Sequence, residues 1–240
     1  MCTLEKRGNI FVLTLTGDDQ HRLNPTLIST LRSHLSQIKA QSTRGSALVT
    51  LAEGKFFSNG FDLDWAQKNS RSADEARAKL VEMVELFRPV VKDLIALPMP
   101  TIGAITGHAA AAGLVLALSH DHVFMRRDRG VMYMSEVDIG LTFPDYFSVF
   151  FRSKVASPAA RRDLLLNGMK LKAEDAVAMG IIDSAYDDAE KTVDAAVQLA
   201  EKLGKRKWDG VVYGEIRKSL LPELCDIVGL VGAGVATSRL

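Results

Sequence analysis

Residues 101–141 read TIGAITGHAAAAGLVLALSHDHVFMRRDRGVMYMSEVDIGL, and this stretch decides the fold. It begins with an apolar, β-like run at 101–106, which Gly107 interrupts. Small residues at 109–113 then lead into an apolar helical run at 114–118. Small side chains let a ligand approach the backbone closely. The stretch therefore predicts a strand that turns into a helix at a point suited to ligand binding.

The residues after this turn suggest what chemistry it serves. The first N–H groups of a helix lack partners inside the helix and carry the positive end of its dipole, which suits an oxygen that becomes negative during a reaction. Further along, Glu136 has mostly apolar neighbours, namely Val131, Met132, Met134, Val137 and Ile139. A carboxylate in apolar surroundings has a raised pKa and can act as a general base near neutral pH. The same pattern also fits tight helix packing beside a solvated glutamate.

Length and charge bound the class of protein. The chain has 240 residues, enough for one domain with a full core and a small extension. Hydrophobic residues make up 47% and charged residues 25%, as in ordinary soluble globular proteins. The net charge is only +1, so the composition gives no overall attraction to nucleic acid or to an anionic membrane.

Cysteine usage and the chain ends bear on compartment. Cys2 and Cys225 form no CxxC or metal-binding spacing, which favours a reducing intracellular compartment. We expect no secretory signal at the N-terminus and no bilayer-spanning run. The last residues, Ser238-Arg239-Leu240, match the small–basic–Leu peroxisomal address. They predict a peroxisomal protein that binds the import receptor.

Strands and helices are expected to alternate up to about residue 186, with helices only beyond it. This order favours an α/β core at 1–186 followed by a helical region at 187–240. Asn24-Pro25 reads as a helix start, and Pro89 predicts a kink or break in a long helix at 72–97. The expected strands are 10–16, 47–51, 101–106, 121–124, 131–134 and 181–186, and the other expected helices are 25–39, 61–66, 114–118, 158–167, 172–179, 187–203 and 214–221.

Two segments together resemble one family. FFSNGFDL, at 56–63, is similar to the F-(S/A)-x-G-x-D-(L/I) segment of the crotonase, or enoyl-CoA hydratase/isomerase, superfamily. GHAAAAGLVLALSHD, at 107–121, resembles that family's G-x-A-x-G-G-G-x-x-L-A-x-x-C-D segment. Their order and separation also fit, and the similarity runs from about Leu4 to Ile182. With YMSEVDIGL and the terminal SRL, the chain is most similar to the plant peroxisomal Δ3,Δ2-enoyl-CoA isomerases.

The resemblance implies a fold and a site. The fold would be a spiral of β-β-α units with a helical C-terminal region that supports trimers or hexamers. The backbone N–H groups of Phe61 and Ala112 would form an oxyanion hole for the thioester oxygen of an acyl-CoA. No metal and no cofactor beyond the CoA of the substrate would be needed. The substrate and CoA contacts would come from His21, Arg22, Leu23, Ser58, Asn59, Gly60, Phe61, Asp62, Leu63 and Gly113.

Departures from the family pattern separate the possible reactions. The family's triple glycine is Ala111-Ala112-Gly113 here, and the family's second glutamate matches Glu136 if one extra residue is allowed in the preceding turn. Hydratases carry a glutamate where this chain has Val115, so a water would lose one of its two anchors. A single base can still move a proton. The resemblance therefore implies an isomerase of β-oxidation that shifts the double bond of 3-enoyl-CoA to trans-2-enoyl-CoA, with Glu136 as the base.

Other readings stay open at this point. An enoyl-CoA hydratase is disfavoured by Val115, and a dienoyl-CoA isomerase would need a further acid, for which Asp138 and Asp145 are weak candidates. A non-catalytic acyl-CoA-binding homologue would have no need of Glu136. His120-Asp121-His122 lacks an evident third metal ligand. The basic pairs and runs at 126–127 and 205–207 either meet CoA phosphates or form a solvated face.

Overall fold

The structure, a computed structural model, describes residues 1–230, so the predicted targeting tripeptide at 238–240 lies outside the described residues. Six strands form a large sheet in the order β1-β2-β3-β5-β7-β9. β1 and β2 are antiparallel, and all other neighbours are parallel. Parallel neighbours require crossover connections, which the intervening helices supply. The bounds are β1 Cys2–Arg7, β2 Ile10–Leu15, β3 Ala47–Ala52, β5 Thr101–Ile105, β7 His122–Arg126 and β9 Ser184–Tyr186.

A second, smaller sheet is parallel and has the order β4-β6-β8, with β4 Phe56–Ser58, β6 His108–Ala110 and β8 Met132–Tyr133. Each of its strands follows one strand of the large sheet (β3, β5 or β7) and precedes a helix. The chain therefore repeats a β-β-α unit that advances along both sheets. The α/β class and the spiral of β-β-α units expected from the sequence are confirmed.

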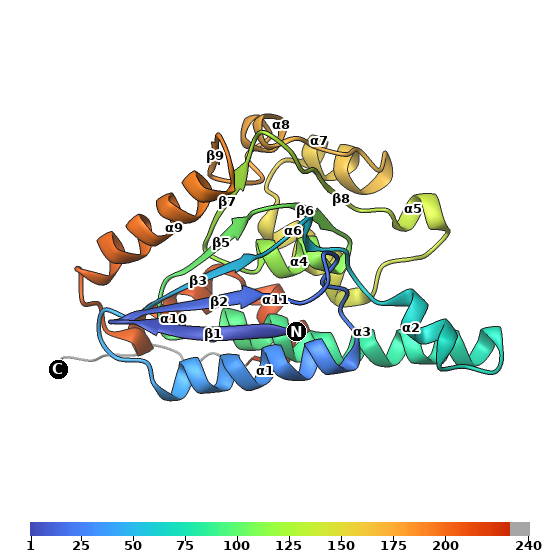
Figure 1. Ribbon diagram of the computed structural model, residues 1–240, viewed down its shortest axis with the longest axis horizontal. Helices are drawn as coiled ribbons and strands as arrows, with labels where there is room; N and C mark the ends of the chain where they lie inside the picture. The colour runs from blue at the N-terminus through green and yellow to red at the C-terminus, as the bar shows by residue number, and fades with distance from the viewer. Residues whose placement is uncertain (231–240) are drawn as a thin grey trace.

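Helices cover both faces of the large sheet, as Figure 1 shows, with α9 on one side and α1 and α3 on the other. α1 begins as predicted, because the Asn24 side chain accepts a hydrogen bond from Leu27 N and Pro25 occupies the first turn. The helical elements are α1 Pro25–Ala40, α2 Leu63–Lys68, α3 Ala73–Ile95, α4 Ala112–Leu118, α5 Glu136–Ile139, α6 Asp145–Lys154, α7 Pro158–Arg161, the π-helical turn η1 Arg162–Leu166, α8 Ala173–Ala178, α9 Ala189–Gly204, α10 Gly210–Leu220 and α11 Pro222–Ile227.

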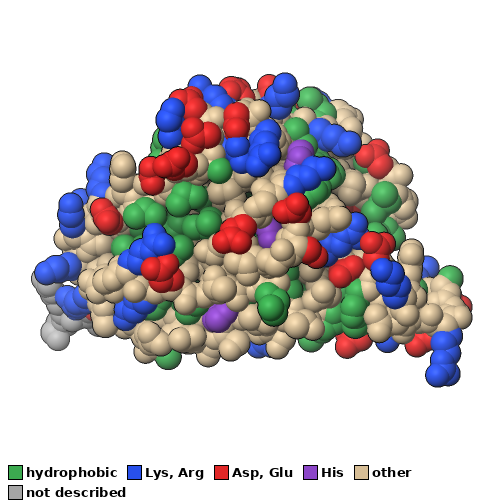
Figure 2. Space-filling view, viewed as in Figure 1, with side chains coloured by type: hydrophobic (Ala, Val, Ile, Leu, Met, Phe, Trp, Pro, Cys, Tyr) green, Lys and Arg blue, Asp and Glu red, His purple; other side chains and the backbone are tan. Residues whose placement is uncertain are grey.

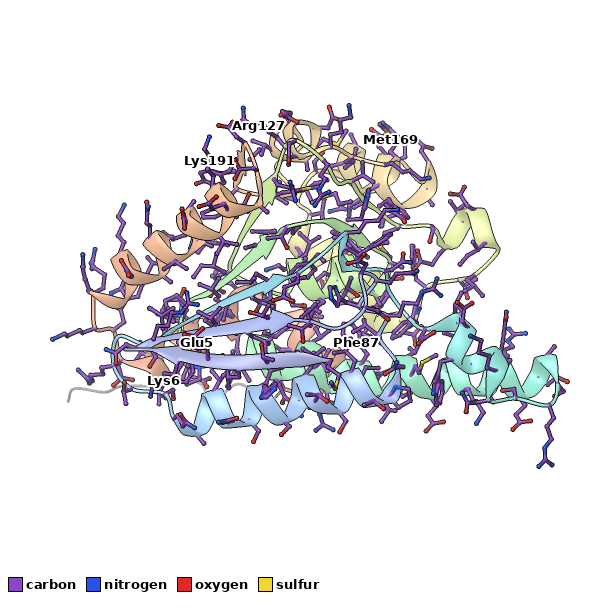
Figure 3. The ribbon with its side chains drawn as sticks, in the orientation of Figure 1. Glu5, Lys6, Phe87, Arg127, Met169 and Lys191 are labelled. Atoms are coloured by element: carbon purple, nitrogen blue, oxygen red, sulfur yellow. The ribbon has the colours of Figure 1, made fainter. Side chains whose placement is uncertain are left out.

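The alternation of side chains along β2 explains how the sheet fills two cores. Ile10 and Val12 pack toward Ala196 and Ala200 of α9. Phe11 and Leu13 point the other way, into the main core beneath the sheet. Phe87 of α3, labelled in Figure 3, is fully buried in that main core. The large sheet is therefore packed on both faces, and the strands of the smaller sheet follow from its strands.

The structure differs from the sequence expectations in a few places. β1, β4, β6, α5, α6 and α11 were not predicted. Pro89 was expected to kink or break the long helix, but α3 continues through it without interruption. Beyond β9, the described residues are helical, as predicted. The division into a core at 1–186 and a separate region at 187–240 stays a prediction.

The surface in Figure 2 shows basic and acidic side chains interspersed, with no field of a single sign on the visible face. Arg127, labelled in Figure 3, is an example, since it lies within 4 Å of both Glu174 and Asp187. Within residues 1–230, no helix is both long and apolar enough to cross a bilayer.

Candidate active site

The three segments singled out in the sequence all leave the same edge of the small sheet. β4 ends at Ser58, β6 at Ala110 and β8 at Tyr133. Ser58 lies in register with Ala109, and Ala110 with Tyr133. Because the three strands are parallel, their carboxyl ends meet at one edge of the sheet. This edge brings together the segments that carry Phe61, Ala112 and Glu136, and such an edge is where open α/β sheets bind ligands.

Two glycines let the first two segments pack backbone against backbone. A Cβ atom at Gly113 would lie 2.3 Å from the carbonyl oxygen of Ser58. A Cβ atom at Gly60, which has φ +73°, would lie 2.9 Å from the Ala111 methyl. Both positions therefore require glycine. The close approach fixes the backbone around Phe61 relative to the start of α4.

The amide of Phe61 is left without a partner by the way Leu23 pairs with this segment. Leu23 N donates to Gly60 O at 2.7 Å, and Asp62 N donates to Leu23 O at 3.3 Å. This parallel bridge uses the residues on either side of Phe61 and leaves its own N–H unused. Ala112 is the first residue of α4, so its N–H also has no intrahelical acceptor. Neither N–H has a protein acceptor among residues 1–230.

The turn into α4 is strained. Ala111 has φ 49° and ψ −126°, a conformation that favours glycine. Its neighbour Ala112 is fully buried, so both methyl groups that replace family glycines are accommodated. The backbone path anticipated from the sequence is thus followed, with the strain concentrated at Ala111. Strain of this kind commonly lies at functional sites.

Glu136 is buried at the start of α5, with 8% of its surface exposed. Its Oε2 atom has no hydrogen-bond partner among the described residues. Burial raises the pKa of Glu136, while the backbone N–H groups of Glu136 and Ser135 oppose that shift. An unpaired, desolvated carboxylate of this kind is suited to accept a proton.

Glu136 and Phe61 line one cavity of about 430 Å³. Apolar side chains form its walls, contributed by α3, the loop after α5 and α6; among them are Leu80, Val84, Phe143 and Phe147. The Phe61 ring stacks on Phe147 with 6.3 Å between centroids and meets Phe87 edge-on at 5.7 Å. The cavity therefore combines one buried carboxylate, Glu136, with these apolar side chains, while the exposed Glu85 and Asp145 and the side chains of Arg77 and Arg88 also line it. Phe143 and Phe147 of this wall belong to the aromatic run FPDYFSVFF at 143–151.

Comparison with known proteins decides the family. The sequence profile of the enoyl-CoA hydratase/isomerase family matches residues 5–213. The chain belongs to the enoyl-CoA hydratase/isomerase family. The solved apo structure of the Mtb enoyl-CoA isomerase superposes with a TM-score of 0.83 at 21% identity, covering 95% of this chain and 94% of that one. At this identity the likeness supports the family's fold alone.

Relatives within the family extend along the whole chain. The peroxisomal enoyl-CoA delta isomerase 2 of Arabidopsis thaliana is 62% identical over 241 residues, covering 100% of both chains. The peroxisomal enoyl-CoA delta isomerase 1 of the same plant is 53% identical, covering 100% of this chain and 98% of its own. Enoyl-CoA delta isomerase 3, whose name gives no compartment, is 58% identical over 100% of both chains. The similarity to the plant isomerase branch that the sequence motifs indicated is confirmed.

Val115 distinguishes this chain from the hydratase pattern of the family. It lies one turn into α4 and is fully buried, so no carboxylate occupies that position. Asp145 lines the same cavity as Glu136, but it is exposed at the first position of α6. Asp138 is exposed on α5. Glu136 is therefore the buried carboxylate of this cavity.

The residues expected to contact CoA fall into two groups. Arg22 and Asp62 line a separate cavity of about 320 Å³ together with Trp65. Arg22 also pairs with Asp64 at 3.1 Å, and Asp62 caps α2 by accepting from Trp65 N at 2.9 Å. Asn59 and Leu63 are half-buried beside this segment. These residues are placed where a polar part of a ligand has access.

Three other residues of that set are enclosed and support the backbone. The buried His21 ring lies with Nδ1 2.9 Å from Phe56 O, and Ser58 Oγ donates to His21 O at 2.8 Å. Leu23 is fully buried. Their contact with CoA stays a prediction, and their visible role is to hold the segment that carries Phe61.

The metal reading of His120-Asp121-His122 finds no support in the geometry. The buried His120 ring is engaged by Thr50 Oγ1 at 2.7 Å and Ala117 O at 3.0 Å, while His122 faces Asp183. Within residues 1–230, no group of three or more His, Cys, Asp or Glu side chains is arranged to hold a metal ion.

Proposed function

We propose that the protein is a Δ3,Δ2-enoyl-CoA isomerase, which converts 3-enoyl-CoA to trans-2-enoyl-CoA. The observation that carries the chemistry is the buried Glu136 carboxylate, with an unpaired oxygen, in one cavity with Phe61. The full-length similarity to enoyl-CoA delta isomerases supports the same reaction. Hydratase and dienoyl-CoA isomerase activities are not favoured.

The reaction begins with the thioester oxygen between the N–H groups of Phe61 and Ala112. Glu136 removes a proton from C2 of the 3-enoyl chain, and the electron pair delocalises over the diene and the thioester oxygen. The two amides stabilise that oxygen as it becomes negative, and such a donor typically contributes about 10²–10³ in rate. We expect the strained turn at Ala111 to orient the second amide, which follows it directly in the chain.

The same carboxyl group completes the reaction. Glu136, now protonated, returns the proton at C4, which leaves the double bond between C2 and C3 and regenerates the carboxylate. Its raised pKa suits both halves of this transfer, because the group must first accept and then release a proton. The apolar Val115 provides no second anchor for a water, so addition across the double bond is disfavoured.

The CoA portion of the substrate would lie along residues 58–63 and reach Arg22. This arrangement places the thioester at Phe61 and sends the acyl chain between Leu80 and Phe147, into the cavity of Glu136. The polar end would enter the neighbouring cavity beside Arg22 and Trp65. We expect no cofactor beyond this CoA.

The biological setting follows from the same resemblance. The reaction serves β-oxidation of unsaturated fatty acids, whose double bonds reach the 3-position during chain shortening. Two of the relatives carry a peroxisomal name, and Ser238-Arg239-Leu240 fits recognition by the peroxisomal import receptor. We further propose that the protein acts in the peroxisome as a homotrimer or a pair of trimers.

The test compares Glu136→Gln with Asp138→Asn, which removes an exposed carboxylate from the same short helix. We expect Glu136→Gln to lower kcat for isomerisation by about 10³, within the usual range for a general base, and Asp138→Asn to leave it nearly unchanged. Formation of the conjugated thioester is followed by ultraviolet absorbance, with water addition to 2-enoyl-CoA measured in parallel. Efficient hydration by the unmodified protein, or good isomerisation by Glu136→Gln, would contradict the proposal.

A further inference from the structure

The cavity that holds Glu136 changes in character from its inner side to its outer side. Glu136 and Phe147, on the inner side, have 8% and 1% of their surfaces exposed. Val81 and Leu141 line the same cavity and are 55% and 41% exposed. The cavity therefore opens to solvent between α3 and the segment that follows α5, and we call Val81 and Leu141 its mouth.

The inner side is closed by aromatic rings that two helices hold in place. Phe147 of α6 packs edge-on against Tyr146, with 4.9 Å between the ring centroids. The Tyr146 hydroxyl donates to Val84 O at 2.9 Å, which ties α6 to α3. The Phe61 ring stacks on Phe147, and the fully buried Phe87 meets Phe61 edge-on. An acyl chain whose thioester lies at Phe61 therefore meets a closed wall on this side.

An apolar path leads outward to the mouth. Leu80 and Val81 each lie one helical turn from Val84, so the three side chains share the face of α3 that lines the cavity. Leu141 and Phe143 line it from the segment after α5. Leu80 and Val84 are partly buried against the main core, whereas Val81 and Leu141 are exposed. A hydrocarbon chain that runs outward would cover these exposed side chains, and burial of apolar surface is favourable.

The charged side chains of the cavity favour a plain hydrocarbon tail. Arg77 and Arg88 line the cavity together with the exposed carboxylates Glu85 and Asp145. Arg88 already pairs with Glu85 at 2.9 Å. Apart from the buried Glu136, two cations and two anions balance, so no net charge attracts a tail that ends in a charged group. The mouth therefore suits an uncharged chain end.

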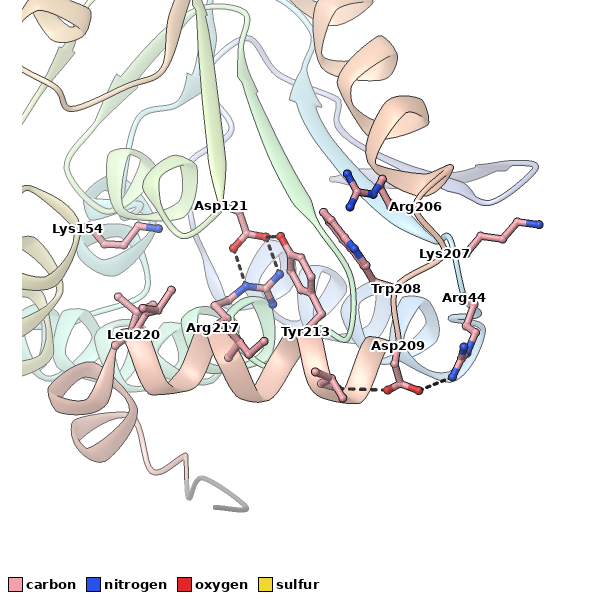
Figure 4. Close-up of a pocket in the computed structure, with 13 residues that line it drawn as sticks. Arg44, Asp121, Lys154, Arg206, Lys207, Trp208, Asp209, Tyr213, Arg217 and Leu220 are labelled. Atoms are coloured by element: carbon pink, nitrogen blue, oxygen red, sulfur yellow. Dashed lines mark hydrogen bonds and ion pairs between the residues drawn. The ribbon is translucent and has the colours of Figure 1, made fainter. Parts of the chain in front are cut away.

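Another cavity, of about 740 Å³, is no continuation of this path. Figure 4 shows that it lies beside α10, with Asp121 and Arg217 in its wall. Among residues 1–230, it shares no lining residue with the Glu136 cavity. It also borders the helical region that is expected to support trimers, so its exposure in a single chain does not indicate a ligand site. The mouth is formed instead by residues within the core at 1–186.

We propose that the mouth binds the distal part of the acyl chain, so that Val81 and Leu141 make the enzyme selective for long-chain over short-chain 3-enoyl-CoA. This inference rests on the proposed isomerase function. A hexenoyl chain has only two carbons beyond C4, whereas a hexadecenoyl chain has twelve and extends to the mouth. The distal chain takes no part in the proton transfer, so its binding is the same in the substrate and in the transition state. Contact with the mouth therefore lowers KM and leaves kcat unchanged.

The test compares trans-3-hexenoyl-CoA with trans-3-hexadecenoyl-CoA, both below the concentrations at which they form micelles. We expect Val81→Asn to lower kcat/KM for hexadecenoyl-CoA about tenfold more than for hexenoyl-CoA, through KM, because each methylene withdrawn from water contributes about fourfold in affinity. Leu141→Asn, across the mouth, should change the selectivity in the same direction. Val177→Asn is the matched control, since Val177 is an exposed valine of α8 that lines neither active-site cavity, and its selectivity should equal that of the unmodified protein.

Isomerisation of both substrates with a selectivity that Val81→Asn leaves unchanged, or that Val177→Asn changes equally, would overturn this inference alone. An unmodified protein that isomerises neither substrate would overturn the proposed function and this inference with it. Sedimentation velocity supplies an independent measurement. If Val81→Asn alters the oligomeric state and lowers activity on both substrates alike, the mouth is a contact between copies and does not bind the acyl chain.

Discussion

Glu136 and Asp121 are both carboxylates withdrawn from water, yet their surroundings are opposite. Glu136 has an unpaired oxygen and a raised pKa. Asp121 is bound at both oxygens by Arg217, each at 2.6 Å, and also accepts from Thr101 N and Tyr213 OH. Burial alone would raise the pKa of Asp121, but the Arg217 charge and hydrogen bonds lower it overall.

The difference shows how one fold assigns two roles to the same functional group. Arg217 also donates to the carbonyl oxygens of Ile95 and Leu97, so the Asp121 pair ties α10 to the loop between α3 and β5. That carboxylate is fixed and kept ionised, and its role is structural. Glu136 has no cationic partner of this kind, its Oε2 atom has no hydrogen-bond partner among the described residues, and the turn at Ala111 is strained. The buried Glu136 charge therefore lowers the stability of the folded protein, whereas the Asp121 charge is compensated by Arg217.

The largest expected effect on stability comes from removing Arg217, the partner of Asp121. Arg217→Met would leave the Asp121 charge buried alone, and we expect a loss of about 3–5 kcal/mol in the free energy of unfolding at neutral pH. Urea unfolding measures this loss. A double variant, Arg217→Met with Asp121→Leu, should lose less than the single variant because it removes the orphaned charge. A double variant that is less stable than the single one would show that the ion pair is not the dominant contribution.

Removing the charge of Glu136 should change the free energy of unfolding in the opposite direction and by a smaller amount. Glu136→Gln removes a desolvated charge, so at neutral pH we expect a stability gain on the order of 1 kcal/mol despite the loss of activity. The folded pKa of Glu136 lies above its ordinary 4.5, so the native state binds more protons there and stability falls as pH rises through that window. Glu136→Gln should abolish this fall, measured by urea unfolding across the acidic range.

Asp121 provides the control for the sign of that pH dependence. Its folded pKa lies below its ordinary 3.8, so its stabilisation is present above 3.8 and is lost as pH falls through the folded value. Glu136→Gln should therefore leave the low-pH loss intact. A Glu136→Gln variant whose stability falls with pH from 4.5 upward as steeply as that of the unmodified protein would contradict the assignment of Glu136 as the desolvated group.

The smallest expected effect concerns the strained turn. Ala111→Gly relieves the φ 49° conformation but increases the freedom of the unfolded chain, and we expect a net gain of about 1 kcal/mol. Ala110→Gly, in the adjacent strand β6, is the matched control and should be destabilising. Thermal unfolding of both variants gives the comparison. A loss of stability in Ala111→Gly equal to that in Ala110→Gly would show that the turn is not strained.

The sequence carried the local features of the site well. Asn24-Pro25 marked the start of α1, and the apolar neighbours of Glu136 indicated the raised pKa that burial produces. The strands β4 and β6 were missed because three residues are too few to show an alternating pattern. The edge where Phe61, Ala112 and Glu136 meet depends on those strands, so its geometry was not evident from local sequence.

The Asp121–Arg217 pair was missed for a different reason. Its members are 96 residues apart, and Asp121 looked like part of a His-Asp-His pattern rather than half of an ion pair. A single sequence gives no sign of which distant charges meet. The kink or break predicted at Pro89 was wrong, because tertiary packing along α3 outweighs the local tendency of proline to break a helix.

The pairing of β6 with β8 has a consequence for how such a protein changes over generations. The loop that contains Gly130 precedes β8 and the pairing of Ala110 with Tyr133, so a change in the length of this loop would leave that pairing in place. Insertions there are absorbed before the strand is reached, so the distance from strand to glutamate is preserved. The loop of each β-β-α unit can thus vary in length independently. The segment after one strand of the small sheet can then change while the segments after the other two strands keep their positions.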